Sequence, residues 1–302
     1  MNPRFGKVAV LMGGPSAERE VSLKSGQAVL AGLLEAGVDA FAVDADAAVL
    51  RELETRGADR AFIALHGPWG EDGVIQGALE TIGMPYTGSG VLGSALAMDK
   101  LRSKQVWMST GIPTPAFTVL HGEQDLDTAN GELGLPMFVK PSREGSSLGV
   151  TKVTGGENLH SAWSAARALD ACVLAEQCIQ GKELTIAILG GNALPAIRLE
   201  TPHTFYDYAA KYEADTTRYL CPCGLEVSLE QQLQTLALAA FEALGCSGWG
   251  RVDLMLDEAE RPYFLEVNTV PGMTDHSLVP MAAQAAGITF PQLVTHILET
   301  SL

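Results

Sequence analysis

Short apolar runs alternate with amphipathic stretches along the first third of the chain. The runs that fit strands are residues 8–12, 38–43 and 61–65, and the stretches that fit helices are residues 17–34 and 47–56. Strands and helices that alternate at this spacing predict a parallel sheet, whose ligands gather beyond the carboxyl ends of the strands. Gly13-Gly14 and His66-Gly67 lie at two of these ends. Ser16 is the candidate N-cap of the first helix.

The pattern changes after residue 98. A helix is expected over residues 99–109, and the bend at residues 111–115, which contains two prolines, is typical of a domain boundary. The remaining expected strands are residues 137–140, 172–178, 184–189, 251–256 and 263–268, and the remaining expected helices are residues 157–169, 229–244 and 290–298. Residues 201–219 are polar and aromatic without periodicity, and loops of this length are usually functional or disordered.

Polar side chains interrupt the last two expected strands at alternate positions. Successive strand side chains point to opposite faces, so three alternate side chains of each strand, including the polar ones, should share one face. These are Arg251, Asp253 and Met255 on the first strand and Phe264, Glu266 and Asn268 on the second. Two carboxylates and an amide, without His or Cys, favour Mg²⁺, which usually arrives with nucleotide phosphates. The alternative is a buried ion pair between Arg251 and one acid, which would leave the other acid and Asn268 unexplained.

Composition narrows the class of protein. The 302 residues are 47% hydrophobic and 19% charged, which is enough to build cores in two or three domains. No apolar run approaches the ~20 residues that span a bilayer, and the first residues lack the apolar segment of a signal peptide, so a cytoplasmic location is expected. A net charge of −16 argues against nucleic acid as a partner. The five scattered cysteines fit neither a disulfide framework nor a zinc site.

Two glycine-containing segments are candidate phosphate-binding loops. Residues 88–93 fit G-x-G-x-x-G, but no acidic residue ends a second strand about 20 residues later, as a dinucleotide fold requires. Residues 142–149 are mostly small, and small side chains let backbone N–H groups approach anionic oxygens. An isolated loop of this kind is more often a hairpin turn. Lys140 just before it, together with the Mg²⁺-type site, favours a phosphate cradle.

Several segments, in chain order, resemble the D-alanine–D-alanine ligase family. They are residues 13–22, His66-Gly67, residues 98–100, residues 140–147, residues 205–208 with Lys211-Tyr212, and residues 268–274. The resemblance covers essentially the whole chain and implies an ATP-grasp fold of mixed α/β and α+β class. It implies an N-terminal parallel-sheet domain over residues 1–98, with ATP held between a central domain (99–190) and a C-terminal domain (191–302). Residues 201–219 would form a lid, and the protein would be a homodimer.

The activity that the resemblance implies is the joining of two D-alanine molecules by ATP, through D-alanyl phosphate, for peptidoglycan precursor synthesis. Two Mg²⁺ or Mn²⁺ ions would be held by Asp253, Glu266 and Asn268. The residues implied to bind the nucleotide are Lys100, Lys140, Ser147, Glu176, Glu183 and Lys211. Among them, Glu176 would bind the adenine amino group and Glu183 the ribose hydroxyls. Without the resemblance, each of these two acids would be interpreted as a solvated strand-edge residue.

The resemblance also implies a set of contacts to the two D-alanine molecules. Glu18 would bind the ammonium of the first, although an acid at a helix start is usually only a dipole partner. Arg251 and the Gly272 N–H would stabilise the tetrahedral intermediate. The carboxylate of the second D-alanine would bind to Ser277 and the Leu278 amide. His66 is expected near the substrates, although a His at a strand end is as often a structural hydrogen-bonding residue.

Tyr212 would close the lid by hydrogen bonding with Glu18 and Ser146, which would keep water away from the acyl phosphate. Three other functions remain open. One is a ligase that joins D-alanine to D-lactate, against which Tyr212 argues. Another is a different ATP-grasp carboxylate–amine ligase, against which Glu18 and Ser277 argue. The third is a non-catalytic nucleotide sensor, which would be expected to lack Arg251 or a metal ligand.

Overall fold

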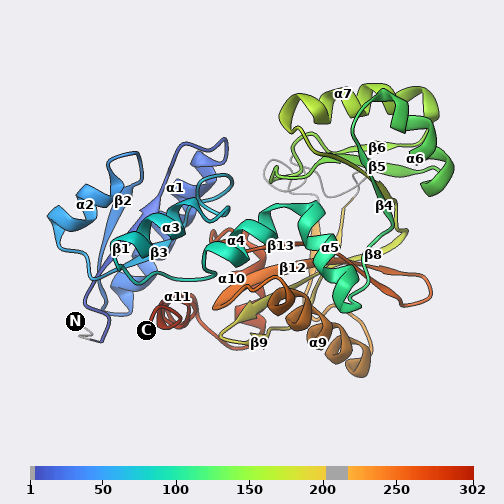
Figure 1. The fold of residues 1–302 in the computed structure, drawn as a ribbon. Helices are drawn as coiled ribbons and strands as arrows, with labels where there is room; N and C mark the ends of the chain where they lie inside the picture. Colours follow the sequence, from blue (N-terminus) through green and yellow to red (C-terminus); the bar gives the residue numbers. More distant parts are fainter. Residues whose placement is uncertain (1–3, 202–216) are drawn as a thin grey trace.

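Three sheets with their covering helices make up the computed structural model, which describes residues 4–201 and 217–302 (Figure 1). The first sheet has the order β2-β1-β3, formed by β1 (Lys7–Met12), β2 (Asp39–Asp44) and β3 (Arg60–Ile63). Strand β1 pairs in parallel with both neighbours. The predicted parallel sheet is therefore confirmed. Its helices are α1 (Arg19–Glu35), α2 (Val49–Arg56) and α3 (Val74–Thr81).

The prediction that Ser16 caps helix α1 was wrong. The helix begins after Glu18, and no side chain makes a capping hydrogen bond there. The hydroxyl of Ser16 instead donates to the carbonyl oxygen of His66 at 2.7 Å. This serine therefore joins the two turns at the carboxyl ends of β1 and β3, which is a use that local sequence does not reveal.

The second sheet is antiparallel and has the order β4-β7-β5-β6. Its strands are β4 (Phe117–Leu120), β5 (Met137–Pro141), β6 (Thr151–Val153) and β7 (Val173–Gln177). Helices α6 (Leu126–Leu133) and α7 (Leu159–Leu169) pack on it through a core of their own, and Figure 1 shows α7 above the sheet and α6 beside it. The loop between β5 and β6 is the predicted phosphate cradle.

The third sheet lies below the second in Figure 1. Its order is β11-β10-β8-β12-β13, with β9 paired to β8. The strands are β8 (Gly181–Leu189), β9 (Asn192–Ala193), β10 (Ile197–Glu200), β11 (Arg218–Leu220), β12 (Trp249–Asp257) and β13 (Pro262–Asn268). Two helices, α4 (Val91–Met98) and α5 (Lys100–Thr110), lie in the chain between the first and second sheets. Helix α9 (Val227–Ala243) comes between β11 and β12, and α10 (Leu278–Ala285) and α11 (Phe290–Glu299) follow β13. Strand β8 precedes the proposed boundary at residue 190, yet it pairs with β10 and β12.

Strand β13 contains a bulge that the sequence pattern does not reveal. Asp253 of β12 pairs with Glu266, but the next residue, Leu254, pairs with Phe264, so Leu265 is an extra residue. A bulge of this kind breaks the alternation of side chains between the two faces. Phe264 is fully buried in the core beneath the sheet. The prediction that Phe264 shares a face with Glu266 was therefore wrong, whereas Glu266 and Asn268 do lie opposite Asp253 and Arg251.

The glycines at residues 88–93 have a packing role. Helix α4 starts at Val91, and a Cβ on Gly93 would lie 2.6 Å from the carbonyl oxygen of Gly245. Only a residue without a side chain allows the two backbones to approach so closely. Among the described residues, no helix is both long and apolar enough to cross a membrane.

Candidate active site

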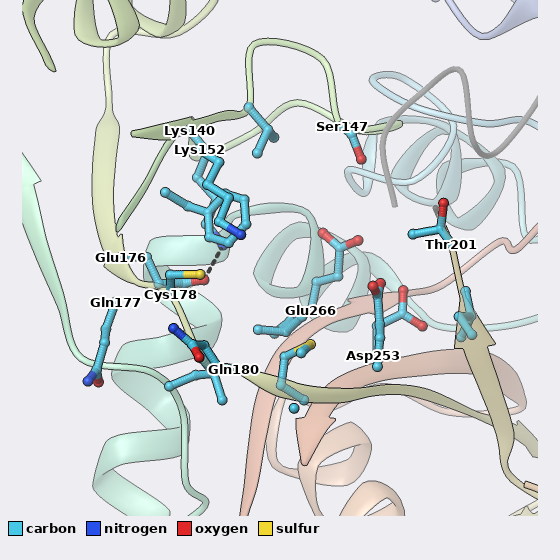
Figure 2. Close-up of a pocket in the computed structure, with 18 of the residues that line it drawn as sticks. Lys140, Ser147, Lys152, Glu176, Gln177, Cys178, Gln180, Thr201, Asp253 and Glu266 are labelled. Atoms are coloured by element: carbon cyan, nitrogen blue, oxygen red, sulfur yellow. Dashed lines mark hydrogen bonds and ion pairs between the residues drawn. The ribbon is translucent and has the colours of Figure 1, made fainter. Parts of the chain in front are cut away.

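A cavity of about 680 Å³ lies between the second and third sheets. Most of the described residues that were predicted to bind nucleotide or metal line it, namely Lys100, Lys140, Ser147, Glu176, Glu183, Asp253 and Glu266. Figure 2 shows Lys140 and Glu176 on one side and Asp253 and Glu266 on the other. The cavity is thus bounded by a lysine–glutamate pair on the second sheet and by acids on the third.

Asp253 is the centre of a hydrogen-bonded group on β12. Its two carboxylate oxygens accept from Nε and Nη2 of Arg251, at 2.8 and 2.7 Å. The amide of Asn268 donates to the same carboxylate at 3.1 Å, and the hydroxyl of Thr185 donates at 2.6 Å. The ion pair considered as an alternative from the sequence is present, and it includes Asn268 as well. Thr185 on the neighbouring β8 was not anticipated, because its contact depends on strand pairing.

Glu266 faces the cavity beside Lys100, which is the first residue of α5. The Lys100 ammonium lies 3.1 Å from the Glu266 carboxylate and donates to the carbonyl oxygen of Glu144 at 2.8 Å. Glu144 belongs to the loop of residues 142–149. This lysine therefore links the candidate metal site to the candidate phosphate loop.

The loop itself has an uncommon backbone conformation. Ser146 and Ser147 have φ of 51° and 60°, in the left-handed region that residues other than glycine seldom adopt. Such conformations persist where surrounding contacts enforce them, and they are concentrated at binding sites. Here Ser142 accepts from the Leu101 N–H at 3.0 Å and donates to Asp99 at 2.7 Å, which fixes the start of the loop against α5.

Glu176 on β7 is a buried acid with two lysines. Its Oε1 pairs with Lys140 at 2.8 Å, and its Oε2 pairs with the ammonium of Lys104 from α5. Burial by itself would raise the pKa of Glu176, but the two lysines outweigh burial and lower it. Burial lowers the pKa of Lys104 to about 8. The sequence indicated Lys140 and Glu176 as binding residues but gave no sign of Lys104, which is 72 positions away from its partner.

Glu18 and Ser146 lie together, although 128 residues separate them. The hydroxyl of Ser146 donates to the Glu18 carboxylate at 2.8 Å, and a Cβ on Gly145 would lie 2.5 Å from that carboxylate. The helix start beyond β1 therefore contacts the loop that borders the nucleotide-sized cavity. Lys211 and Tyr212, which were predicted to join this site, lie outside the described residues.

His66 is buried, and both of its ring nitrogens are engaged. Nδ1 lies 2.8 Å from the carbonyl oxygen of Val270, and Nε2 lies 3.0 Å from the hydroxyl of Ser25. The carbonyl can only accept, so Nδ1 carries the proton and Nε2 accepts from the hydroxyl. Burial lowers the pKa of His66, which favours this neutral form. Ser25 also accepts from the Met273 N–H at 3.1 Å. The N-terminal region therefore binds the backbone on both sides of Gly272, through His66 at Val270 and through Ser25 at Met273.

Glu71, an acid that the sequence did not single out, lies where the turn after β3 meets the segment after β13. Its carboxyl accepts from the N–H of Gly67 at 2.7 Å and from the N–H of Val270 at 3.1 Å. Burial, and then the neighbouring charge of Glu18, raise the pKa of Glu71 to about 8. Together with His66 and Ser25, this side chain fixes the backbone on which Gly272 lies.

Gly272, Ser277 and Leu278 lie at the start of helix α10. Ser277 is the N-cap residue, and its hydroxyl accepts from the Thr274 N–H at 2.9 Å. A Cβ on Gly272 would lie 2.9 Å from that hydroxyl, so the glycine and the helix start are neighbours. The free N–H groups of a first helical turn favour an anion. This end of α10 can therefore receive a carboxylate.

The donor set on β12 and β13 fits a divalent cation that prefers oxygen. Asp253 and Glu266 are paired across the two strands, and Asn268 adds an amide oxygen. Arg251 and Lys100 now neutralise the two carboxylates, which is the charge that a metal ion would supply. Across residues 4–201 and 217–302 no group of three or more His, Cys, Asp or Glu side chains is placed to hold a metal, so the candidate set is two acids and one amide.

Comparison with known proteins identifies the family of this chain. Two sequence families match, one described as D-ala D-ala ligase C-terminus over residues 106–299 and one described as D-ala D-ala ligase N-terminus over residues 44–89. A D-alanine–D-alanine ligase of Nitrosococcus oceani is 61% identical over 298 residues, which cover 99% of this chain and 94% of the relative.

Solved structures extend the likeness to the fold. The crystal structure of a D-alanine–D-alanine ligase from Bacillus anthracis matches with a TM-score of 0.88 and 37% identity, and it covers 98% of this chain and 97% of that one. The structure of the Bacillus anthracis ligase in complex with ATP matches with a TM-score of 0.85 and 35% identity, over the same shares of the two chains. The predicted ATP-grasp fold is thereby confirmed. On its sequence and on its fold, the chain belongs to the D-alanine–D-alanine ligase family.

Proposed function

We propose that this protein uses ATP to join two D-alanine molecules into D-alanyl-D-alanine, a precursor for peptidoglycan. The observation that carries the proposal is the contact between Glu18 and Ser146. It brings an acid that can bind an ammonium to the loop beside a cavity of nucleotide size. An amino acid held by Glu18 would then have its carboxylate within reach of the phosphates of ATP.

In the first step, a carboxylate oxygen of the first D-alanine attacks the γ-phosphorus of ATP, and ADP leaves. Lys100, Lys140 and the backbone of residues 142–149 bind the phosphates, and Ser147 lies on the same loop. Two Mg²⁺ or Mn²⁺ ions held by Asp253, Glu266 and Asn268 would neutralise the charge that gathers on the phosphates. Glu176 and Glu183 hold the adenine amino group and the ribose, which is consistent with their positions in the cavity wall.

In the second step, the amine of the second D-alanine attacks the carbonyl carbon of D-alanyl phosphate, and the bond to the phosphate oxygen breaks. Arg251 and the Gly272 N–H stabilise the oxyanion that forms. Ser277 and the Leu278 amide, at the start of α10, bind the carboxylate of the second substrate. The fixed backbone on both sides of Gly272 supports this role, because a positioned donor needs no rearrangement when the charge develops.

The remaining assignments are part of the same proposal. His66 lies at the D-alanine site as a neutral side chain that holds the Val270 carbonyl. The cytoplasmic location, the homodimer, the three-domain division and the number of metal ions stay predictions. The roles of Tyr212 and Lys211 also stay predictions, because both residues lie outside the described part of the chain.

The test is phosphate release from ATP with D-alanine, L-alanine or D-lactate, and identification of the product by mass. D-alanine should give D-alanyl-D-alanine with one phosphate released for each dipeptide, and L-alanine should give neither. Ester formation from D-alanine with D-lactate would identify a depsipeptide ligase. Binding of ATP without any release of phosphate would identify a nucleotide sensor and refute the proposal.

A further inference from the structure

Lys104 is fully enclosed behind the wall of the nucleotide cavity, on helix α5. None of its side chain is exposed, and it does not line the cavity, whereas Lys140 and Glu176 do. Its ammonium pairs with Glu176 Oε2 and donates to the hydroxyl of Thr114 at 2.7 Å. That hydroxyl donates in turn to the carbonyl oxygen of Phe264 at 2.8 Å. A charged side chain is almost never buried to this extent unless it is paired, so the burial of Lys104 depends on Glu176.

The two lysines of Glu176 differ in what they can reach. Lys140 lines the cavity and retains some exposure, so an incoming nucleotide can draw its ammonium away (Figure 2). Lys104 is held by Thr114, pairs with the other oxygen of the Glu176 carboxylate and does not line the cavity. Lys104 is therefore placed to remain the counter-ion of Glu176 when a nucleotide engages Lys140.

We propose that Lys104 is a specificity-determining residue that makes the cavity select a 6-amino purine over a 6-oxo purine. It acts by keeping Glu176 ionised and by fixing its orientation, so that the carboxylate only accepts hydrogen bonds. The inference rests on the proposed function in one respect, namely that Glu176 faces the 6-position of the purine.

The argument follows from the chemistry of a buried carboxyl group. Without a counter-ion, a carboxylate in this environment takes up a proton, because burial disfavours the charged form. A protonated Glu176 offers an O–H donor, which matches the 6-oxo group of hypoxanthine as well as an ionised Glu176 matches the 6-amino group of adenine. A site built to accept a hydrogen bond discriminates strongly against the analogue that cannot donate one. Loss of Lys104 should therefore weaken the discrimination and not merely the affinity.

The experiment compares the dissociation constants of ATP and inosine triphosphate by calorimetry, with Mg²⁺ present and D-alanine absent. The parent should bind ATP more tightly, so the dissociation constant of inosine triphosphate divided by that of ATP should be well above one. Lys104→Met, which keeps the length of the side chain, should lower this ratio about tenfold. Arg102→Met is the matched control, because Arg102 is an exposed cation on the same helix that contacts Gln105 and not Glu176. The control should keep the parent ratio.

Two further variants separate this role from a merely structural one. Thr114→Val keeps every charge and removes only the hydroxyl that holds the Lys104 ammonium, so it remains informative even if Lys104→Met does not fold. It should lower the ratio in the same direction, by about threefold. Adding Lys104→Met to Glu176→Gln should change the ratio no further, because Lys104 acts through Glu176.

The inference is overturned if Lys104→Met and Thr114→Val both bind the two nucleotides with the parent ratio, whatever happens to the absolute affinities. It is also overturned if Lys104→Met changes the ratio equally with and without Glu176→Gln. Failure of the proposed function is visible separately, since it shows as a parent protein that forms no dipeptide while its nucleotide ratio still responds to Lys104.

Discussion

Replacing Glu71 with Gln should lower both the stability of the protein and its rate of ligation. The carboxyl of Glu71 accepts from the N–H groups of Gly67, which follows β3 of the first sheet, and Val270, which follows β13 of the third sheet. Glutamine keeps one acceptor oxygen but turns an NH₂ donor toward the other N–H. An N–H left without an acceptor costs about 1 to 3 kcal/mol. The free energy of unfolding should fall by that amount, and ligation should slow because Val270 supports the backbone of Gly272.

The loss of stability should depend on pH. The raised pKa of Glu71, about 8 against an ordinary 4.5, means that the folded state binds this proton more tightly than the unfolded state. The contribution to stability is therefore fully present below about pH 4.5 and is lost as the pH rises to about 8. The slope is at most ~1.4 kcal/mol per pH unit, and smaller because Glu71 is only partly buried. Glutamine does not titrate, so the difference between parent and variant should narrow as the pH rises.

Urea unfolding at about pH 5 and about pH 8, together with the ligation rate at each pH, measures these effects. Glu80→Gln is the control, because Glu80 is an exposed acid on α3 that only contacts the hydroxyl of Tyr86. Its stability should stay within about 0.5 kcal/mol of the parent. Equal stability of Glu71→Gln and parent at the lower pH, or a difference that widens with pH, would refute the reasoning.

Three further predictions concern the proposed chemistry. Glu266→Gln should abolish ligation at saturating Mg²⁺ while circular dichroism stays unchanged, and more than about a tenth of the parent rate would contradict the metal assignment. Arg251→Ala should raise the barrier to turnover by about 3 to 4 kcal/mol and change ATP affinity much less, so an equal loss in calorimetry would make Arg251 a ground-state ligand only. Tyr212→Phe should weaken use of the second D-alanine and permit ester formation with D-lactate. Parent kinetics and no depsipeptide at any pH would leave Tyr212 without a role in choosing the nucleophile.

Much of the fold could be predicted from the sequence because its strands are compact apolar runs and its longer helices place apolar residues at helical spacing, as Leu233, Ala237 and Ala240 do in α9. Helix α10 was missed because it is short and carries Pro280, which looks like a helix breaker but lies in the first turn, where proline is tolerated. Helix α6 was missed because Asn130 and Gly131 lie inside it. Short elements of this kind form because neighbouring parts of the fold bury them, and a local pattern does not contain that information.

The candidate site also contains residues that the sequence indicates and residues that only the folded structure reveals. Residues such as Asp253 and Glu266 stand out because acids inside apolar strands are unusual. Lys104 and Glu71 do not, because each is a single charged residue in an ordinary helix or loop, and each becomes informative only through a partner 72 or 199 positions away. Side-chain pairing over such distances is determined by the assembled fold.

The extra residue in β13 lets two successive side chains, Leu265 and Glu266, border the cavity between the second and third sheets. One supplies an apolar wall and the other a carboxylate. Deleting Leu265 would leave Glu266 opposite Asp253 and Phe264 opposite Leu254, in regular pairing. The apolar wall and the two acids can therefore be changed independently of each other, which offers a way to reshape the cavity by shortening the strand while the acids keep their places.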